Sequence, residues 1–260
     1  DRGKDAWIVT VAIKYRFIDG SDPLPELHSL MDDLETRFTW SIRPDRPLVE
    51  RLYQYAEGLL GLKELEYLGG PQQGTLKERI ARLRSFILDG MEDRRLVRRS
   101  DEPAPVRIKE LRRSCLDELD RLQERGEHGR PADPTRARAV RQELADLFLA
   151  LQLFSYPGDY VRDCPTCERA AEILTKFEQD ALGLGVAAAR GPRRAIVHIG
   201  EPIRVGSYVP KTGRSRDAAS ALTTELEARI QGLLDAIGPG RPLEESVPAR
   251  PAPAAVATVA

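Results

Sequence analysis

Two short stretches of the sequence carry residue types at spacings that could do chemistry. His28 and Asp33 are separated by four residues in the stretch HSLMDD, and a histidine oriented by a carboxylate can act as a general base. Cys164 and Cys167 form a Cys-Pro-Thr-Cys stretch, and such a pair can be a redox centre or half of a zinc site. Either interpretation depends on the elements that position these side chains.

The pattern around His28 argues against catalysis. An apolar stripe at helical spacing surrounds it: Leu24, Leu27, Met31, Leu34 and Phe38. Positions five apart in a helix differ by roughly 140° around its axis, so His28 and Asp33 diverge. We expect a surface histidine that pairs locally with Asp32, at i+4. We therefore predict no catalytic residue in this chain.

The cysteine pair lacks the companions that a metal site needs. A structural zinc ion takes four ligands, and the remaining cysteine and histidines show no paired spacing: Cys115, His28, His128 and His198. No βαβ pattern surrounds the pair, which argues against a thioredoxin-like redox site. We expect Asp163 or Thr166 to cap a helix here, with incidental thiols. The sequence predicts neither a metal nor a cofactor.

Composition limits the class of protein. The 260 residues are 41% hydrophobic and 31% charged, which is enough for a substantial core. Forty basic and 41 acidic side chains give a net charge of -1, so we expect no nucleic-acid partner. Three cysteines are too few for a disulfide framework and indicate a reducing compartment. No apolar run approaches the roughly 20 residues that a membrane-spanning helix needs.

Two segments far apart in the chain have strand character. Residues 7–17, WIVTVAIKYRF, are β-branched and aromatic, and apolar enough on both sides to predict a buried strand. Residues 195–205, AIVHIGEPIRV, form the second, with a bend or an edge at Gly200 and Pro202. A lone strand cannot satisfy its own backbone. We therefore expect residues 7–16 and 195–204 to lie in one sheet.

The chain between these strands has helical periodicity. Apolar stripes and turn signals predict helices within the following ranges: 24–38, 48–62, 76–87, 108–122, 134–154, 173–177 and 222–234. For the helix 134–154, Asp133 is the expected N-cap and Pro134 the first helical residue. The stretch GGPQQG, residues 69–74, follows a helix and lacks the Lys-Ser/Thr ending of a phosphate loop, so we expect a turn between helices. From Gly238 the chain is rich in Pro and Ala and is expected to be disordered.

Three of these segments resemble a known family in the same order. VAIKYRF (11–17), VHIGEPIRV (197–205) and LTTELEARIQGLLDAIG (222–238) are similar to the C-terminal part of the PlsC-like 1-acylglycerol-3-phosphate acyltransferases. KELEYLGGPQQGTLKERI (63–80) and LFSYPGDYV (153–161) resemble the helical extension of one bacterial branch. The resemblance implies an α/β family whose sheet is only a remnant in this mainly α chain.

The resemblance also implies an order of segments. We expect a sheet-closing strand in residues 1–20, a large helical insertion in 21–190, a second strand and C-terminal helix in 191–237, and a disordered tail in 238–260. The family's catalytic His-x4-Asp and its glycine- and arginine-containing phosphate motif precede the strand that begins here at Trp7. The resemblance therefore implies that the catalytic N-terminal half is absent, and we expect this chain alone to be inactive.

By resemblance, the parent enzyme works in phospholipid biosynthesis. It would move an acyl chain from acyl-CoA or acyl carrier protein (acyl-ACP) to a lysophosphatidate-type acceptor, without a cofactor. Thr10, where the family commonly has Pro, and Lys14 are the residues expected to line the acyl-acceptor side. The implied location is cytoplasmic and peripheral to the inner face of the membrane.

A basic stretch and a helical span leave two further interpretations open. Residues 94–113 hold eight Lys and Arg side chains that could touch anionic headgroups, although interleaved Asp101, Glu102 and Glu110 favour a solvated helix face. The span from about 22 to 190 contains helices but no convincing catalytic set. The alternative function is therefore a non-catalytic helical interaction module.

Overall fold

The structure is a computed structural model that describes residues 5–97, 101–126, 131–156, 158–183, 185–186, 188, 190–208 and 215–243. The chain is mainly helical, with a few short antiparallel strands, as the sequence predicts. It forms two compact units. We call Asp1–Val49 with Cys164–Ala260 the sheet unit, and Glu50–Asp163 the helical unit. The predicted insertion, 21–190, thus contains the helical unit together with helices that belong to the sheet unit.

The described residues of the sheet unit form four strands in two antiparallel pairs. β2 (Val11–Phe17) pairs with β3 (Arg193–Ile199). β1 (Trp7–Ile8) pairs with β4 (Ile203–Arg204), and a short 3₁₀ turn, Val205–Ser207, follows. The predicted segments therefore do pair with each other, but as two ladders instead of one continuous sheet.

The break between the two ladders lies at the predicted bend. The Gly200 N–H donates to the Thr10 carbonyl at 2.8 Å, so the two segments of the chain stay in contact there. A Cβ atom on Gly200 would lie only 2.3 Å from Thr10 Oγ1. The close approach of these two segments therefore favours glycine at this position.

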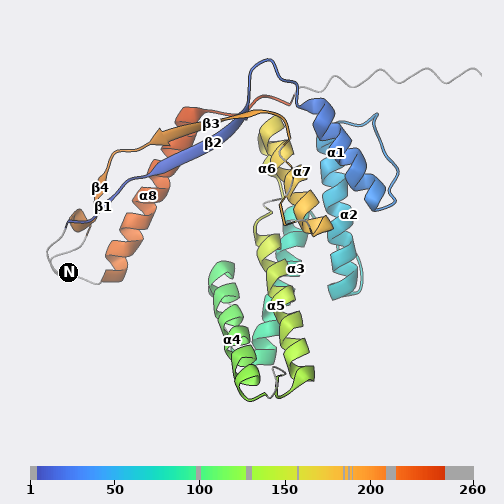
Figure 1. Cartoon of the computed structure of the whole chain (residues 1–260), viewed down its shortest axis with the longest axis vertical. Coiled ribbons are helices and arrows are strands. Elements are labelled where there is room, and N and C mark those ends of the chain that lie inside the picture. The colour runs from blue at the N-terminus through green and yellow to red at the C-terminus, as the bar shows by residue number, and fades with distance from the viewer. Residues whose placement is uncertain are drawn as a thin grey trace, which may run out of the picture. The chain divides into compact units, whose positions relative to one another are not determined.

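Three helices accompany the strands. α1 (Leu24–Arg37) packs against α7 (Cys167–Leu182), and α7 also contacts β2. Their shared apolar residues are buried: Leu27, Leu30, Met31, Leu34, Ala170, Ala171, Leu174 and Phe177. α8 (Ser215–Ile237) runs along the β2–β3 pair and packs against both strands (Figure 1). The sheet unit therefore has α8 on one face of β2–β3.

The chain just after α8 is ordered, which corrects the expectation of disorder from Gly238. The Arg241 N–H donates to Glu168 Oε2 at 2.7 Å, and the Arg241 carbonyl accepts from the Cys167 N–H at 2.9 Å. The Arg241 guanidinium also donates to the Ile18 carbonyl at 3.0 Å. These contacts hold residues 238–243 beside the start of α7. Residues 244–260 lie outside the described residues.

The helical unit is built mainly from long helices. α2 (Leu48–Leu68), α3 (Leu76–Arg95), α4 (Ala104–Glu124) and α5 (Pro134–Phe154) are followed by the short α6 (Tyr160–Asp163). Thr75 and Glu78 form a capping box at the start of α3. Asp133 caps α5, with Pro134 in its first turn, as the sequence predicts. GGPQQG is the turn between α2 and α3.

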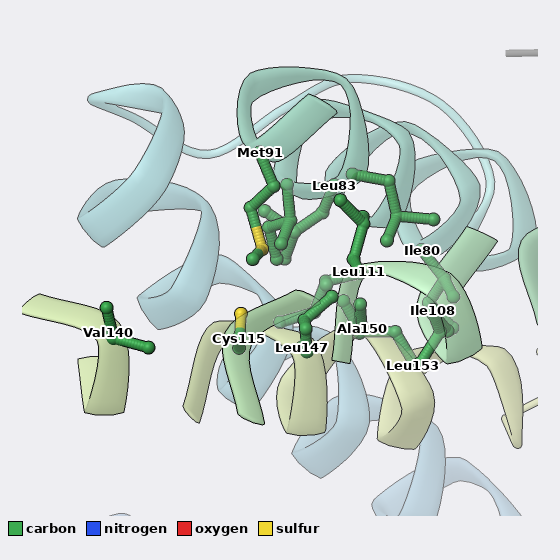
Figure 2. Close-up of a cluster of buried hydrophobic side chains, with 13 residues drawn as sticks. Ile80, Leu83, Met91, Ile108, Leu111, Cys115, Val140, Leu147, Ala150 and Leu153 are labelled. Atoms are coloured by element: carbon green, nitrogen blue, oxygen red, sulfur yellow. The ribbon is translucent and has the colours of Figure 1, made fainter. Parts of the chain in front are cut away.

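One apolar core holds α3, α4 and α5 together (Figure 2). Its buried members are Leu60, Ile80, Leu83, Ile87, Leu88, Met91, Ile108, Leu111, Cys115, Val140, Leu147, Ala150 and Leu153. Burial raises the pKa of the Cys115 thiol to about 11, so this cysteine stays protonated and packs as a small apolar group.

Candidate functional site

The β2–β3 pair has one face that is apolar and exposed. The antiparallel register places Val11 opposite Ile199, Ile13 opposite Val197 and Tyr15 opposite Ala195. Directly opposed residues share a face. Large side chains on this face are solvent-exposed: Val11 46%, Ile13 54%, Tyr15 59%, Val197 51% and Ile199 70%. We call these five residues the open face.

The other face of the pair is occupied by α8. Ala12 is buried there, and Lys14 Nζ donates to the Gly238 carbonyl at 2.6 Å. Arg16 Nη2 donates to the Ile237 carbonyl at 2.5 Å. Cations at a helix C-terminus satisfy its unpaired carbonyls and complement its dipole. The two charged residues of the strand therefore fix the end of α8 to the sheet.

Strand burial is the point at which the sequence interpretation is wrong. The run 7–17 was expected to be buried on both sides, yet Trp7 is 58% exposed and the open face is uncovered. The signal was present in the alternation of VAIKYRF, where apolar residues occupy one face and Lys14 and Arg16 the other. The strand sequence does not indicate that those charges bind a helix end.

Of the two residues predicted to line the acyl-acceptor side, Lys14 lies on β2 and Thr10 immediately precedes that strand. Thr10 is buried at the junction of the two ladders, and within the described part of the chain its hydroxyl has no hydrogen-bond partner. Lys14 is half-buried and holds the α8 C-terminus. Their role toward an acceptor stays a prediction.

His28 and Asp33 both lie within α1, as predicted from the apolar stripe. His28 is half-buried and Asp33 is exposed. Five positions apart on a regular helix, the two side chains point in different directions. The helix therefore keeps His28 and Asp33 apart, as the sequence predicts.

The Cys-Pro-Thr-Cys stretch forms the start of α7. The Thr166 hydroxyl accepts from the Arg169 N–H, which confirms Thr166 as the helix cap. Cys167 is buried, and this burial raises the pKa of its thiol to about 11, which disfavours a reactive thiolate. Among the described residues no group of three or more His, Cys, Asp or Glu side chains could hold a metal ion.

Several arginines of the basic stretch 94–113 bind carboxylates inside the helical unit. Arg107 is buried and donates to Glu92 at 2.7 Å and to Asp89 at 2.5 Å. Arg95 binds the buried Glu143, with Nε at 3.0 Å. Arg98 and Arg99 lie outside the described residues. The stretch thus offers fewer cations to a headgroup surface than its sequence indicates.

Comparisons with known protein families, curated proteins and solved structures found no match. Within the described part of the chain, no helix combines the length and apolar character required to cross a bilayer. The open face and its α8-bound opposite side are therefore the features on which a functional proposal can rest.

Proposed function

We propose that this chain is the C-terminal part of a PlsC-like glycerolipid acyltransferase. The proposed enzyme transfers an acyl group from acyl-CoA or acyl-ACP to the free hydroxyl of a lysophosphatidate-type acceptor. The observation that carries the proposal is the β2–β3 pair, which has α8 on one side and an uncovered apolar face on the other.

This geometry supports the proposal because it would fit within a larger sheet. A two-stranded sheet is marginal by itself, and α/β sheets are covered by helices on both faces. Within the described residues, neither β2 nor β3 has a second neighbouring strand. The outer edges and the open face can therefore accept further strands and a further helical layer, which the catalytic half would supply.

In the proposed enzyme, the catalytic N-terminal half and this chain would contribute different residues to the reaction. A histidine base from the catalytic half would take the proton of the acceptor hydroxyl, and an aspartate would orient that histidine. This chain would contribute β2, which carries Lys14, and Thr10 immediately before it. The Lys14 ammonium has three N–H donors, and the bond to the Gly238 carbonyl uses one of them. The others would serve the phosphate of the acceptor. The enzyme would work in the cytoplasm at the inner membrane face.

The direct test is acyl transfer to lysophosphatidate from radiolabelled acyl-CoA and acyl-ACP. Residues 1–260 alone should be inactive. The natural protein that contains them should be active and should lose at least about a hundredfold when the histidine of its His-x4-Asp is replaced. A natural protein with neither activity nor that motif would overturn the proposal.

A second test addresses the open face directly. In the natural protein, Ile13→Asp should reduce stability by roughly 2–4 kcal/mol, because the charge would be buried beneath the catalytic half. In residues 1–260 alone, Ile13→Asp should have little effect. Leu65→Asp is the matched control, because Leu65 on α2 is 56% exposed. Equal, small effects of Ile13→Asp in both proteins would show that nothing covers this face.

A further inference from the structure

A second apolar surface lies on the helical unit, between α4 and α5. It is an open groove of about 200 Å³. Its lining residues are Ile108, Arg112, Leu116, Leu144, Leu147, Phe148 and Leu151. Ile108 and Leu147 are buried members of the core in Figure 2 and form the floor of the groove. Phe148, which is 60% exposed, and Leu116, which is 36% exposed, form its rims.

The shape of this groove suits another helix. Ile108, Arg112 and Leu116 follow one another at i+4 along α4, and Leu144, Phe148 and Leu151 follow a similar row along α5. Rows of side chains at these spacings create the grooves into which the ridges of a neighbouring helix pack.

Two charged side chains beside the groove, Arg112 and Asp120, form no ion pair with each other. Arg112, Leu116 and Asp120 are four residues apart on α4, so they lie along one side of the helix. Arg112 and Asp120 are separated by about 12 Å along the axis, too far for an ion pair within one chain. In the described part of the molecule, neither side chain forms an ion pair with any other residue.

We propose that a second copy of this chain docks on the groove, with the two α4 helices antiparallel about a two-fold axis at Leu116. Antiparallel pairing places Arg112 of each copy opposite the partner's Asp120, and the two-fold symmetry forms this ion pair twice. Leu116 and Phe148 supply the apolar ridge that enters the partner's groove. The opposed helix dipoles also favour the antiparallel arrangement.

The charge order selects this occupant over a lipid-like ligand. An anionic amphiphile would use Arg112 at the rim but would give Asp120 no partner. A second copy satisfies both charges with one symmetric contact. The inference is independent of the acyltransferase proposal, since it concerns a different unit of the molecule.

The test is a charge swap measured by sedimentation velocity. It uses residues 1–260 with Ile13→Asp, so that association through the open face does not interfere. Arg112→Asp and Asp120→Arg should each weaken dimerisation at least about tenfold, because each places like charges in both symmetric contacts. The double variant should restore the dissociation constant to within about threefold of the Ile13→Asp parent. Arg43→Asp and Asp45→Arg, two exposed positions of the sheet unit, are the matched charge controls.

Two outcomes would overturn the proposal. One is a chain that stays monomeric at concentrations up to the solubility limit, and the other is a double variant that fails to recover dimerisation. Leu116→Asp, with helix content checked by circular dichroism, should leave only monomer if the proposal is correct. Palmitate binding by a monomer, abolished by Leu116→Asp, would instead assign the groove to an acyl amphiphile.

Discussion

The two units of this molecule handle their apolar and charged residues in opposite ways. The helical unit surrounds a buried core with α3, α4 and α5, and it pairs several arginines internally. Among the described residues of the sheet unit, α8 covers one face of β2–β3 and the open face is exposed. Its charged strand residues, Lys14 and Arg16, hold a helix end instead.

This difference reflects what each kind of element needs in order to bury its apolar surface and satisfy its backbone. A bundle of three helices can bury a core and satisfy its backbone groups, apart from those at the helix ends, within its own elements. A strand pair needs neighbours at its edges and a layer on each apolar face. The helical unit buries its core within its own helices, whereas additional cover for β2–β3 is what the proposed function predicts.

The largest expected effect comes from a buried ion pair of the helical unit. Glu64 is 0% exposed and accepts from Arg79 Nε at 3.0 Å and Nη2 at 2.7 Å. Arg79→Met should reduce stability by roughly 3–5 kcal/mol, because it leaves a buried carboxylate without its cation. Urea unfolding followed by circular dichroism measures this loss.

The matched control for this pair lies on the surface of the same unit. Lys63 and Glu66 form an exposed pair at 2.8 Å, and Lys63→Met should change stability by less than about 0.5 kcal/mol. Adding Glu64→Gln to Arg79→Met should recover part of the loss, since it removes the buried charge. Equal effects of the two single variants would mean that burial does not distinguish the pairs.

The next effect compares apolar residues of the two units. Leu147 is 2% exposed in the core of the helical unit, and Leu147→Ala should cost about 2–5 kcal/mol by leaving a cavity. Ile13 lies on the open face, and Ile13→Ala in residues 1–260 should cost less than about 1 kcal/mol. Both tryptophans, Trp7 and Trp40, belong to the sheet unit, so tryptophan fluorescence follows that unit and circular dichroism follows the helices. A large loss for Ile13→Ala would mean that the open face is already covered.

The helical unit should also be the more acid-sensitive one. Burial favours a higher pKa for Glu64, but hydrogen bonds from Arg79 and the Gln72 N–H outweigh it and lower the pKa. Hydrogen bonding to Arg136 lowers the pKa of Glu118 against the opposing effect of burial. Carboxyls with lowered pKa values stabilise the fold above their unfolded pKa of about 4.3, and this contribution is lost as pH falls through the folded pKa.

Stability followed by circular dichroism should therefore be nearly constant from about pH 7 to 5 and should fall below about pH 4. Glu118→Gln should reduce the steepness of that fall, because it removes one of the carboxyls whose pKa the fold lowers. An unchanged pH profile in Glu118→Gln would exclude this carboxyl as a source of acid sensitivity.

Much of this architecture could be predicted from periodicity and turn chemistry. The stripes from Leu24 to Phe38 and from Leu76 to Ile87, and the Asp133-Pro134 start of α5, all correspond to helices. These signals are local, since one helix satisfies its own backbone. The pairing of β2 with β3 was also expected, because strands require partners.

Contacts between residues far apart in the chain could not be predicted from the sequence. Lys14 and Arg16 are explained only by α8, more than two hundred residues later in the chain. Arg95 and Arg107 belonged to an apparently solvated basic stretch, but carboxylates on α3 and α5 draw them inward. Likewise, the order in residues 238–243 depends on Arg241 reaching the start of α7 and the chain before α1. No local pattern in the sequence specifies these partners.

The smallest expected effect separates a structural role of Lys14 from its predicted substrate role. Lys14→Met and Arg16→Met each remove one cation from the C-terminus of α8, so each should cost about 0.3–1 kcal/mol of stability, measured by tryptophan fluorescence during urea unfolding. In the natural protein, only Lys14→Met should also raise the KM for lysophosphatidate, by about tenfold, because only Lys14 is predicted to contact the acceptor phosphate. Arg16→Met is the matched control, since Arg16 Nη2 binds the neighbouring carbonyl of the same helix end. Equal increases in KM for both variants would mean that the effect reaches the site through α8. An unchanged KM in Lys14→Met would remove this residue from the acceptor site and leave it with the single task of holding the helix.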